Sequence, residues 1–199
     1  MVYAGTLPLM QSAMHPNEVP IFERAETVPF SWPSDSQPPR AENVDTYSVE
    51  IVVERVAFEK VQASIGWQVT EYQWQRLSNE IVENSMVLIT QFGEPVAVAC
   101  GLSRDNNWVE LAWVAVMPAH RGRGIGRLVC GAVVRQLLAL GKSKIFGSTQ
   151  DERLSAIKIY LDIGFHPLYR KDKIDRWNSI CNKLEKSFTP LLWGWPTDA

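Results

Sequence analysis

Residues 117–131 read MPAHRGRGIGRLVCG, a stretch with three arginines and four glycines. An apolar run ending at Val116 precedes it, and apolar residues at helical spacing follow it. The first turn of a helix has unpaired N–H groups and a positive dipole end. Glycines let a ligand approach those groups, and arginines add charge-assisted contacts. We therefore interpret the stretch as a phosphate-binding loop between a strand and a helix. The alternative is a tight turn with solvated arginines.

Two common phosphate motifs do not fit this stretch. The dinucleotide pattern G-x-G-x-x-G requires glycine at position 127 or 129, where the chain has Arg127 and Val129. The P-loop pattern has its tail at 141–143, but Gln136 stands where its first glycine is required. The pattern that fits is R/Q-x-x-G-x-G/A, over residues 121–126.

Downstream of the loop, the pattern predicts a helix, a strand and a second helix. Apolar residues from Ile125 to Leu140 keep helical spacing, and Gly141 is typical of the residue that follows a helix. Residues 143–149 predict a short strand, and residues 153–163 an amphipathic helix that stops at Gly164. A further strand at 165–168 and a helix at 173–187 are expected after these.

Upstream of the loop, strand signals dominate. Apolar runs with turn residues between them predict an antiparallel meander, and Thr70 is a good N-cap for a helix before it. The expected segments are a strand at 47–56, a helix at 70–82, and strands at 85–92, 95–103 and 108–117. This order predicts an α/β (α+β) fold whose central, mixed but mostly antiparallel sheet is flanked by helices.

Proline marks the expected domain division. Seven of the twelve prolines lie in residues 1–40. Proline fixes φ and removes a backbone donor, so we expect no long helix and no central strand there. We interpret residues 1–40 as an extended arm that packs on the body, with a disordered linker as the alternative. Residues 41–199 then form the folded domain, which ends in the aromatic tail LLWGWP, residues 191–196.

Composition restricts the classes of protein. The formal net charge of the 199 residues is −2, which argues against a nucleic-acid partner. The first fifteen residues lack the basic start of a signal peptide, and the chain has no run of 18 apolar residues, so we expect no membrane segment. Three widely spaced cysteines favour a reducing, cytoplasmic location and argue against a zinc site. We expect no metal.

The loop and its surroundings resemble the GCN5-related N-acetyltransferase (GNAT) superfamily. Residues 121–126 match its acyl-CoA loop, and the strand residues 111–116 end just before it. Residues 156–165, AIKIYLDIGF, look like the family signature A-I-x-L-Y-x-x-x-G-F. The resemblance is clearest over residues 85–168 and extends in weaker form from residue 47.

The resemblance implies acetyl-CoA as the co-substrate. In this family the pantetheine arm lies along the central strand and the pyrophosphate rests on loop amides. Arg153 stands where many relatives have an asparagine, and it either replaces that contact or is solvated. The implied cofactor contacts are Val114, Ala115, Val116, Arg121, Gly122, Arg123, Gly124, Ile125, Gly126, Arg127 and Arg153.

The resemblance also implies catalytic roles. Tyr160 stands where the family places a general acid, and a phenol is protonated at neutral pH. A tyrosine that only packs in the core is the alternative. Glu110 is a candidate base, as in some relatives, or a solvated carboxylate. A backbone N–H near Val114 is the expected oxyanion donor. His120 is expected to have a surface role.

Strand alternation predicts how residues 109–116 divide between the two faces of the sheet. It places Glu110, Val114 and Val116 on one face, together with Ala112, and Val109, Leu111, Trp113 and Ala115 on the other. A β-bulge in the strand would exchange the faces beyond it.

The expected function is transfer of the acetyl group of acetyl-CoA to a primary amine of a small molecule by direct attack. Two alternatives stay open: acetylation of a protein N-terminus or lysine, and a non-catalytic acyl-CoA-binding scaffold. The aromatic tail would suit a homodimer interface, because an exposed apolar patch of that kind seldom stays bare.

Overall fold

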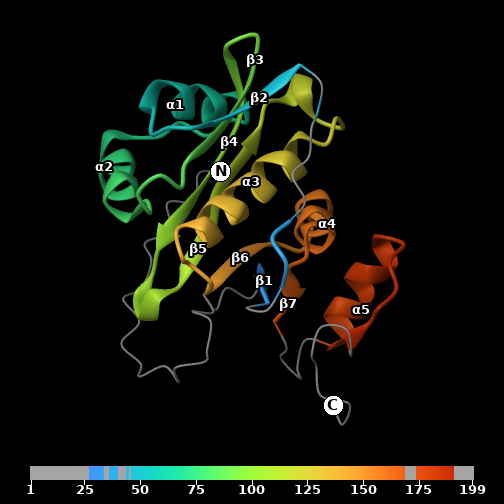
Figure 1. The fold of residues 1–199 in the computed structure, drawn as a ribbon. Helices are drawn as coiled ribbons and strands as arrows, with labels where there is room; N and C mark the ends of the chain where they lie inside the picture. Colours follow the sequence, from blue (N-terminus) through green and yellow to red (C-terminus); the bar gives the residue numbers. More distant parts are fainter. Residues whose placement is uncertain (1–26, 34–35, 40–43, 45, 169–173, 191–199) are drawn as a thin grey trace.

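The computed structural model describes residues 27–33, 36–39, 44, 46–168 and 174–190. Within them, seven strands form one sheet in the order β2-β3-β4-β5-β6-β1-β7 (Figure 1). Neighbouring strands are antiparallel except for β5 and β6, which run parallel. The strands are β1 (Thr27–Ser31), β2 (Tyr47–Ile51), β3 (Val87–Gln91), β4 (Glu94–Ser103), β5 (Val109–Val116), β6 (Ile145–Gln150) and β7 (His166–Pro167).

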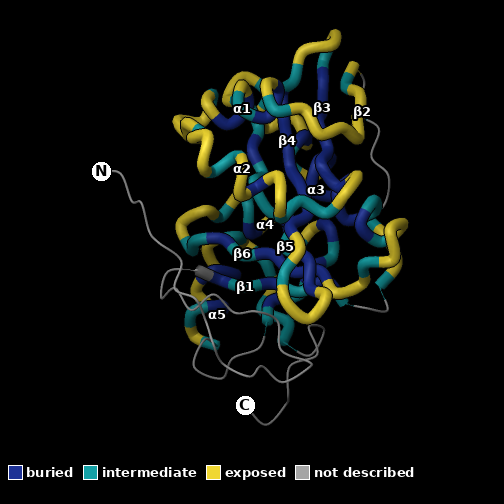
Figure 2. Tube along the Cα trace, turned by 90° about the vertical axis from the view of Figure 1, so that its left-hand side faces the viewer, coloured by how far each residue is buried: buried dark blue, intermediate teal, exposed yellow. Residues whose placement is uncertain are grey.

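Helices cover both faces of this sheet. On one face, α1 (Arg55–Ser64) and α2 (Glu71–Glu80) enclose a core with β3, β4 and β5. On the other, α3 (Ile125–Ala139), α4 (Leu154–Ile163) and α5 (Ile174–Lys183) share a larger core with the sheet. The strands in the middle are buried and the exposed residues gather on outer turns and helix faces (Figure 2). This mixed, mostly antiparallel architecture confirms the predicted fold class.

The helices that the sequence predicts begin and end for the expected reasons. Thr70 caps α2 through a capping box, in which the Gln73 N–H donates to Thr70 Oγ1 at 3.2 Å and the Gln73 side chain accepts from the Thr70 N–H at 2.9 Å. Gly141 and Gly164 follow α3 and α4 with φ of 74° and 110°, a left-handed conformation that favours glycine.

The expected strand at 47–56 is wrong in its second half. Strand β2 ends at Ile51, and the chain turns into α1 at Arg55. Helix α1 was not predicted from the sequence, because it lacks start signals. Its N-cap residue Glu54 makes no side-chain cap, its first turn has no acidic residue, and the β-branched run continues to Val56.

The expectation of no central strand in residues 1–40 is also wrong. Strand β1 lies inside the sheet, bonded to β6 on one side and to β7 on the other. Pro29 is tolerated because its backbone N and O point toward β7 and not toward β6. The Pro29 carbonyl accepts a hydrogen bond from Leu168 N–H at 3.1 Å, on the side of β7. The N and O of one strand residue point to the same neighbour, so the missing donor leaves the β1–β6 ladder intact.

The aromatic tail at 191–196 and the first 26 residues lie outside the described residues. The division into an arm at 1–40 and a domain at 41–199 therefore stays a prediction. Among the helices that the structure describes, none combines the length and the apolar character that crossing a bilayer requires.

We predict that β1 is part of the stabilising core. Phe30 is fully buried, with its ring centroid 5.2 Å from those of both Tyr160 and Trp177. Replacing Phe30 with Ala should lower the free energy of unfolding by about 3–5 kcal/mol, measured by chemical denaturation, because a large cavity is left. The matched control is Phe92→Ala, because Phe92 is 87% exposed. That change should stay within about 0.5 kcal/mol. Equal losses in the two variants would contradict the placement of β1.

Candidate active site

The two parallel strands in the sheet separate after a short contact. Strands β5 and β6 are paired at Val109–Ile145 and Glu110–Phe146, and no further register pair joins them in the described residues. Beyond that point lies a cavity of about 600 Å³. Its lining includes residues of β5, β6 and α4, and of α1 and α2 on the other side. The opening of the sheet is therefore a slot with walls from both layers.

A β-bulge shapes the β5 wall. Val98 pairs with Ala115 and Cys100 pairs with Ala112, so Trp113 and Val114 together face the single residue Ala99. Trp113 has φ of 55°, in the left-handed region that a bulky residue rarely adopts.

The bulge overturns the simple alternation of β5. Val114 and Val116 pack on the same side as Val109 and Leu111, against the core of α3 and α4. Ala115 instead is buried in the core under α1, with Ala112 and Trp113 beside it. The side chains that line the cavity include Val114 but neither Ala115 nor Val116.

The glycine loop stands at the end of β5 and leads into α3. Gly122 and Gly124 have φ of 75° and 78°, and a Cβ at either would meet nothing within 4 Å. Gly124 is the N-cap of α3 and makes no side-chain cap, so the first amides of a 15-residue helix are not covered by a capping side chain. Gly126 has a different role. A Cβ there would lie 2.7 Å from Ile159 Cδ1, so this glycine lets α3 approach α4.

The loop arginines lie on the surface. Arg121 donates through Nε to the Val116 carbonyl at 3.3 Å, which ties the loop to the end of β5. Arg127 is exposed, Ile125 is buried under the first turn of α3, and none of residues 121–127 lines the cavity. The loop is thus exposed and lies outside the cavity, although Gly126 packs against Ile159, which lines it.

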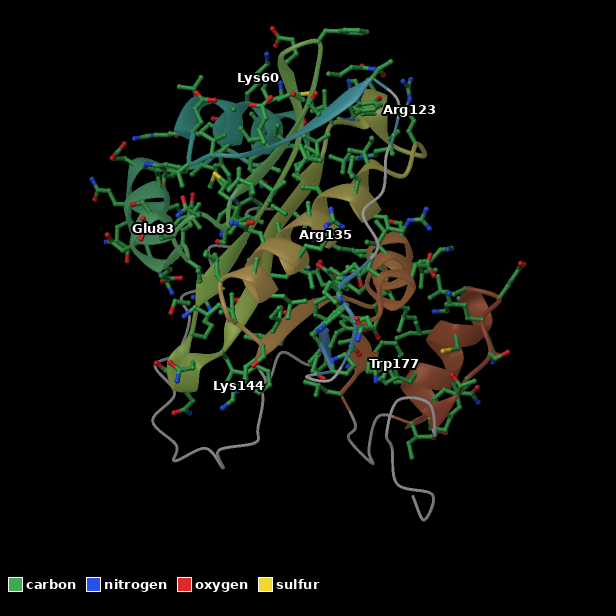
Figure 3. All side chains as sticks on the ribbon, in the orientation of Figure 1. Lys60, Glu83, Arg123, Arg135, Lys144 and Trp177 are labelled. Atoms are coloured by element: carbon green, nitrogen blue, oxygen red, sulfur yellow. The ribbon has the colours of Figure 1, made fainter. Side chains whose placement is uncertain are left out.

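Sequence reasoning missed Tyr47, the first residue of β2, as a neighbour of the loop. Its hydroxyl lies 3.0 Å from His120 Nδ1 and accepts from Arg123 Nη1 at 3.4 Å. The two rings also meet edge to face, with centroids 5.8 Å apart. Figure 3 shows Arg123 beside the start of β2. His120 is half-buried, and its expected surface role stays a prediction. Nothing in a strand pattern marks Tyr47.

Tyr160 lines the cavity from α4 and is 5% exposed. Phe30 and Phe165 enclose its ring, with centroids at 5.2 Å and 5.7 Å. Burial raises the pKa of Tyr160 well above its ordinary value, and Cys130 and Glu110 add to this, while Arg153 opposes it. The hydroxyl therefore keeps its proton at any physiological pH. Burial also raises the pKa of the neighbouring Cys130 thiol to about 12, so that thiol is not a nucleophile.

Glu110 reaches the same cavity from β5, but it is not a solvated carboxylate. Its Oε2 accepts from Arg104 Nε at 2.9 Å and from Arg104 Nη2 at 2.7 Å. Arg104 also donates to Glu80 at 2.6 Å, and Glu80 in turn accepts from Arg76. Burial alone would lower the pKa of Arg104, but Glu110 and Glu80 outweigh it and raise that pKa. This network fixes α2 to the wall of the cavity.

Arg153 is exposed at the start of α4 and lines the cavity near Tyr160. The structure thus brings Glu110, Val114, Arg153 and Tyr160 to one cavity. The loop residues stand beyond it, and Ala115 and Val116 do not line it. Among the described residues, no group of three or more His, Cys, Asp or Glu side chains could hold a metal ion.

The chain is similar to known acetyltransferases. The model of the Acetyltransferase (GNAT) family matches residues 53–165, more than half of the chain. The chain therefore belongs to this acetyltransferase family. No curated protein matches it.

Three solved structures illustrate the likeness. A GCN5-related N-acetyltransferase from Sphaerobacter thermophilus has a TM-score of 0.62 and 21% identity, covering 72% of this chain and 48% of that one. A GCN5-related N-acetyltransferase from Kribbella flavida has a TM-score of 0.53 and 22% identity, covering 71% of this chain and 54% of that one. The ribosomal-protein-S18-alanine N-acetyltransferase from Escherichia coli has a TM-score of 0.53 and 17% identity, covering 62% of this chain and 79% of that one. At these identities the likeness shows the fold, and the chain spans about half of the length of the first two.

We predict that Tyr160 makes stability fall at alkaline pH. The phenol of an unfolded chain titrates at about 10, and the folded state holds this proton more tightly. The stability that the neutral phenol contributes is thus complete below about pH 10 and is lost as the pH rises through the raised folded pKa. Between about pH 9 and 11 the urea midpoint should fall more steeply for the wild type than for Tyr160→Phe.

The control for this titration is Tyr72→Phe, because Tyr72 is 73% exposed. That variant should follow the wild type at every pH. Parallel curves for the wild type and Tyr160→Phe would show that the phenol titrates normally.

Proposed function

We propose that the chain is an acetyl-CoA-dependent N-acetyltransferase that acts on a primary amine of a small molecule. The observation that carries this proposal is the separation of β5 from β6 around a cavity lined by Glu110, Val114 and Tyr160. Ligand pockets for small molecules usually measure about 300–1,000 Å³, and the volume of about 600 Å³ lies within this range.

The residues present fit acetyl-CoA. A separated strand leaves backbone donors and acceptors for an amide-containing arm, and the glycine loop offers uncapped amides of α3 to phosphates. The side chains of Arg121 and Arg123 would add charge at the rim. When bound, acetyl-CoA would supply an acyl carbon activated as a thioester.

Tyr160 is the general acid of this proposal. Because the pKa of a thiol is about 8.5, a phenol with a raised pKa acts on departing sulfur first as a hydrogen-bond donor. The proton can then pass from the hydroxyl to the sulfur, since desolvation also raises the pKa of the thiol that forms. In support of this role, the Phe30 and Phe165 rings hold the Tyr160 ring at the wall of the cavity.

Glu110 is the proposed base, and it would take the proton that the amine loses when nitrogen bonds the acyl carbon. The two Arg104 hydrogen bonds to Oε2 hold the carboxylate in place. They also compete with any proton for that oxygen, so we assign proton acceptance to Oε1. The Val114 N–H in the bulge is the proposed oxyanion donor.

Acetylation of a protein N-terminus is the second candidate. Its support is the fold shared with the ribosomal-protein-S18-alanine N-acetyltransferase of Escherichia coli. Activity on peptides but not on small amines in the same assay would select this candidate.

We predict that Gly124 is required for acetyl-CoA binding. A valine there would be strained at φ of 78°, and it would stand at the N-cap of α3, next to the amides offered to the phosphates. Gly124→Val should weaken acetyl-CoA binding by about tenfold or more, or about 1.4 kcal/mol, measured by calorimetry. The matched control is Gly93→Val, because Gly93 has φ of 82° and open space as well but lies in the turn before β4. That variant should lose similar stability and keep its affinity, and equal affinities in both variants would remove the loop from the site.

We predict that Tyr160→Phe reduces turnover more than binding. Loss of a general acid should lower kcat by about 10²-fold or more, measured as thiol release from acetyl-CoA over a panel of small amines. The affinity for acetyl-CoA should change little, because the ring is retained. Tyr72→Phe again serves as the control. Turnover at the wild-type rate in Tyr160→Phe would show that another group protonates the leaving sulfur.

A further inference from the structure

The peptide bond between Trp113 and Val114 lies at the centre of the bulge, and neither of its residues has a register partner in β4. The register pairs on either side of it are Ala112–Cys100 and Ala115–Val98. Both residues of this peptide line the cavity. Since strand pairing does not fix the orientation of this peptide, other contacts must do so.

Helix α1 and the segment that follows it supply those contacts. Gln62, in its last turn, is 3% exposed, and its Nε2 donates to the Trp113 carbonyl oxygen at 2.8 Å. The Trp113 ring packs edge to face on Phe58 and Trp67, at centroid distances of 5.5 Å and 6.1 Å. The backbone carbonyl of Gln62 also accepts from Trp67 N–H at 3.0 Å. Both the carbonyl and the ring of Trp113 are thus held from one side.

The held carbonyl determines where the next donor points. The described chain has no cis peptide, and in a trans peptide the N–H lies opposite the C=O. With the Trp113 carbonyl directed at Gln62, the Val114 N–H is directed away from α1. Val114 itself packs on the opposite face of the sheet from Trp113. A rotated peptide would instead present a carbonyl oxygen, which repels an oxyanion.

We propose that Gln62 is a positioning residue that keeps the Val114 N–H available as a hydrogen-bond donor to the acyl oxygen in the cavity. This inference rests on the proposed acetyl transfer. Only the amide nitrogen of Gln62 can donate to a carbonyl, so the hydrogen bond also fixes the orientation of that side chain. Replacing Gln62 with Met keeps its length and removes the donor, which leaves the buried carbonyl without its partner.

The direct test is the infrared carbonyl stretch of acetyl-CoA labelled with ¹³C at the thioester carbonyl. In the wild-type protein this band should move to lower wavenumber on binding, because a positioned N–H polarises the carbonyl. In Gln62→Met the band should return toward its position in buffer. The acetyl-CoA dissociation constant should stay within about twofold, and kcat should fall by about tenfold, since removal of a whole oxyanion donor costs about 10²–10³.

Two further variants separate positioning from folding. Ser85→Ala removes another buried bond to the sheet, because Ser85 Oγ exchanges two hydrogen bonds of 3.1 Å with Gly101. It should lower the melting temperature like Gln62→Met and leave the band unchanged. Gln62→Glu can donate only when its carboxyl is protonated, so its band shift should be present at acid pH and vanish as the pH rises.

The outcomes are distinguishable. If the wild-type protein binds acetyl-CoA with a shifted band that Gln62→Met leaves in place, the role of Gln62 is refuted and the proposed function stands. The same holds if Ser85→Ala abolishes the shift equally, or if the band of Gln62→Glu ignores pH. If acetyl-CoA does not bind the wild-type protein at all, both proposals fall. Loss of the shift in Gln62→Met alone, with pH-dependent recovery in Gln62→Glu, supports the inference.

Discussion

The site depends on the point at which β5 and β6 stop sharing hydrogen bonds. Strand β6 is paired with β1 along its length, from Thr27–Gln150 to Ser31–Phe146. Strand β5 follows β4 and bends at the bulge of Trp113. Two strands held by different neighbours diverge, and the backbone groups along the gap need partners from elsewhere. The opening is therefore a slot in which backbone groups of β5 and β6 are left beside apolar and polar side chains.

The charged wall of this slot is organised around one guanidinium. Arg104 lies between Glu80 of α2 and Glu110 of β5, with distances of 2.6 Å and 2.7 Å. Arginine offers several donors in a fixed plane, so it can hold two carboxylates at once. Removing one partner from such a partly buried network leaves an uncompensated charge, so each of the three side chains depends on the others. Here the geometry is that of a carboxylate facing the cavity beside a protonated phenol.

Much of this arrangement could be predicted from the sequence, because its signals are local. Thr70, Gly141 and Gly164 marked helix ends, and the glycine spacing of residues 121–126 marked the loop. The features that the sequence does not predict, helix α1 and the bulge at Trp113, depend on tertiary contacts. Helix α1 has no cap to announce it, and it is stabilised by burying Phe58 and Val61. The bulge at Trp113 cannot be read from alternation, because Gln62 and the Phe58 ring hold it from a distant segment.

The place of β1 in the sheet has a consequence for the order in which the molecule can assemble. Thr27 pairs with Gln150, so more than a hundred residues separate the two partners. Closing so large a loop is entropically costly and slow. During synthesis β1 leaves the ribosome before β6, and it can pair only after β6 and Tyr160, whose ring contacts Phe30, have been made. The meander and its helices can collapse earlier, and the wall that carries the phenol is completed only when β1 pairs with β6.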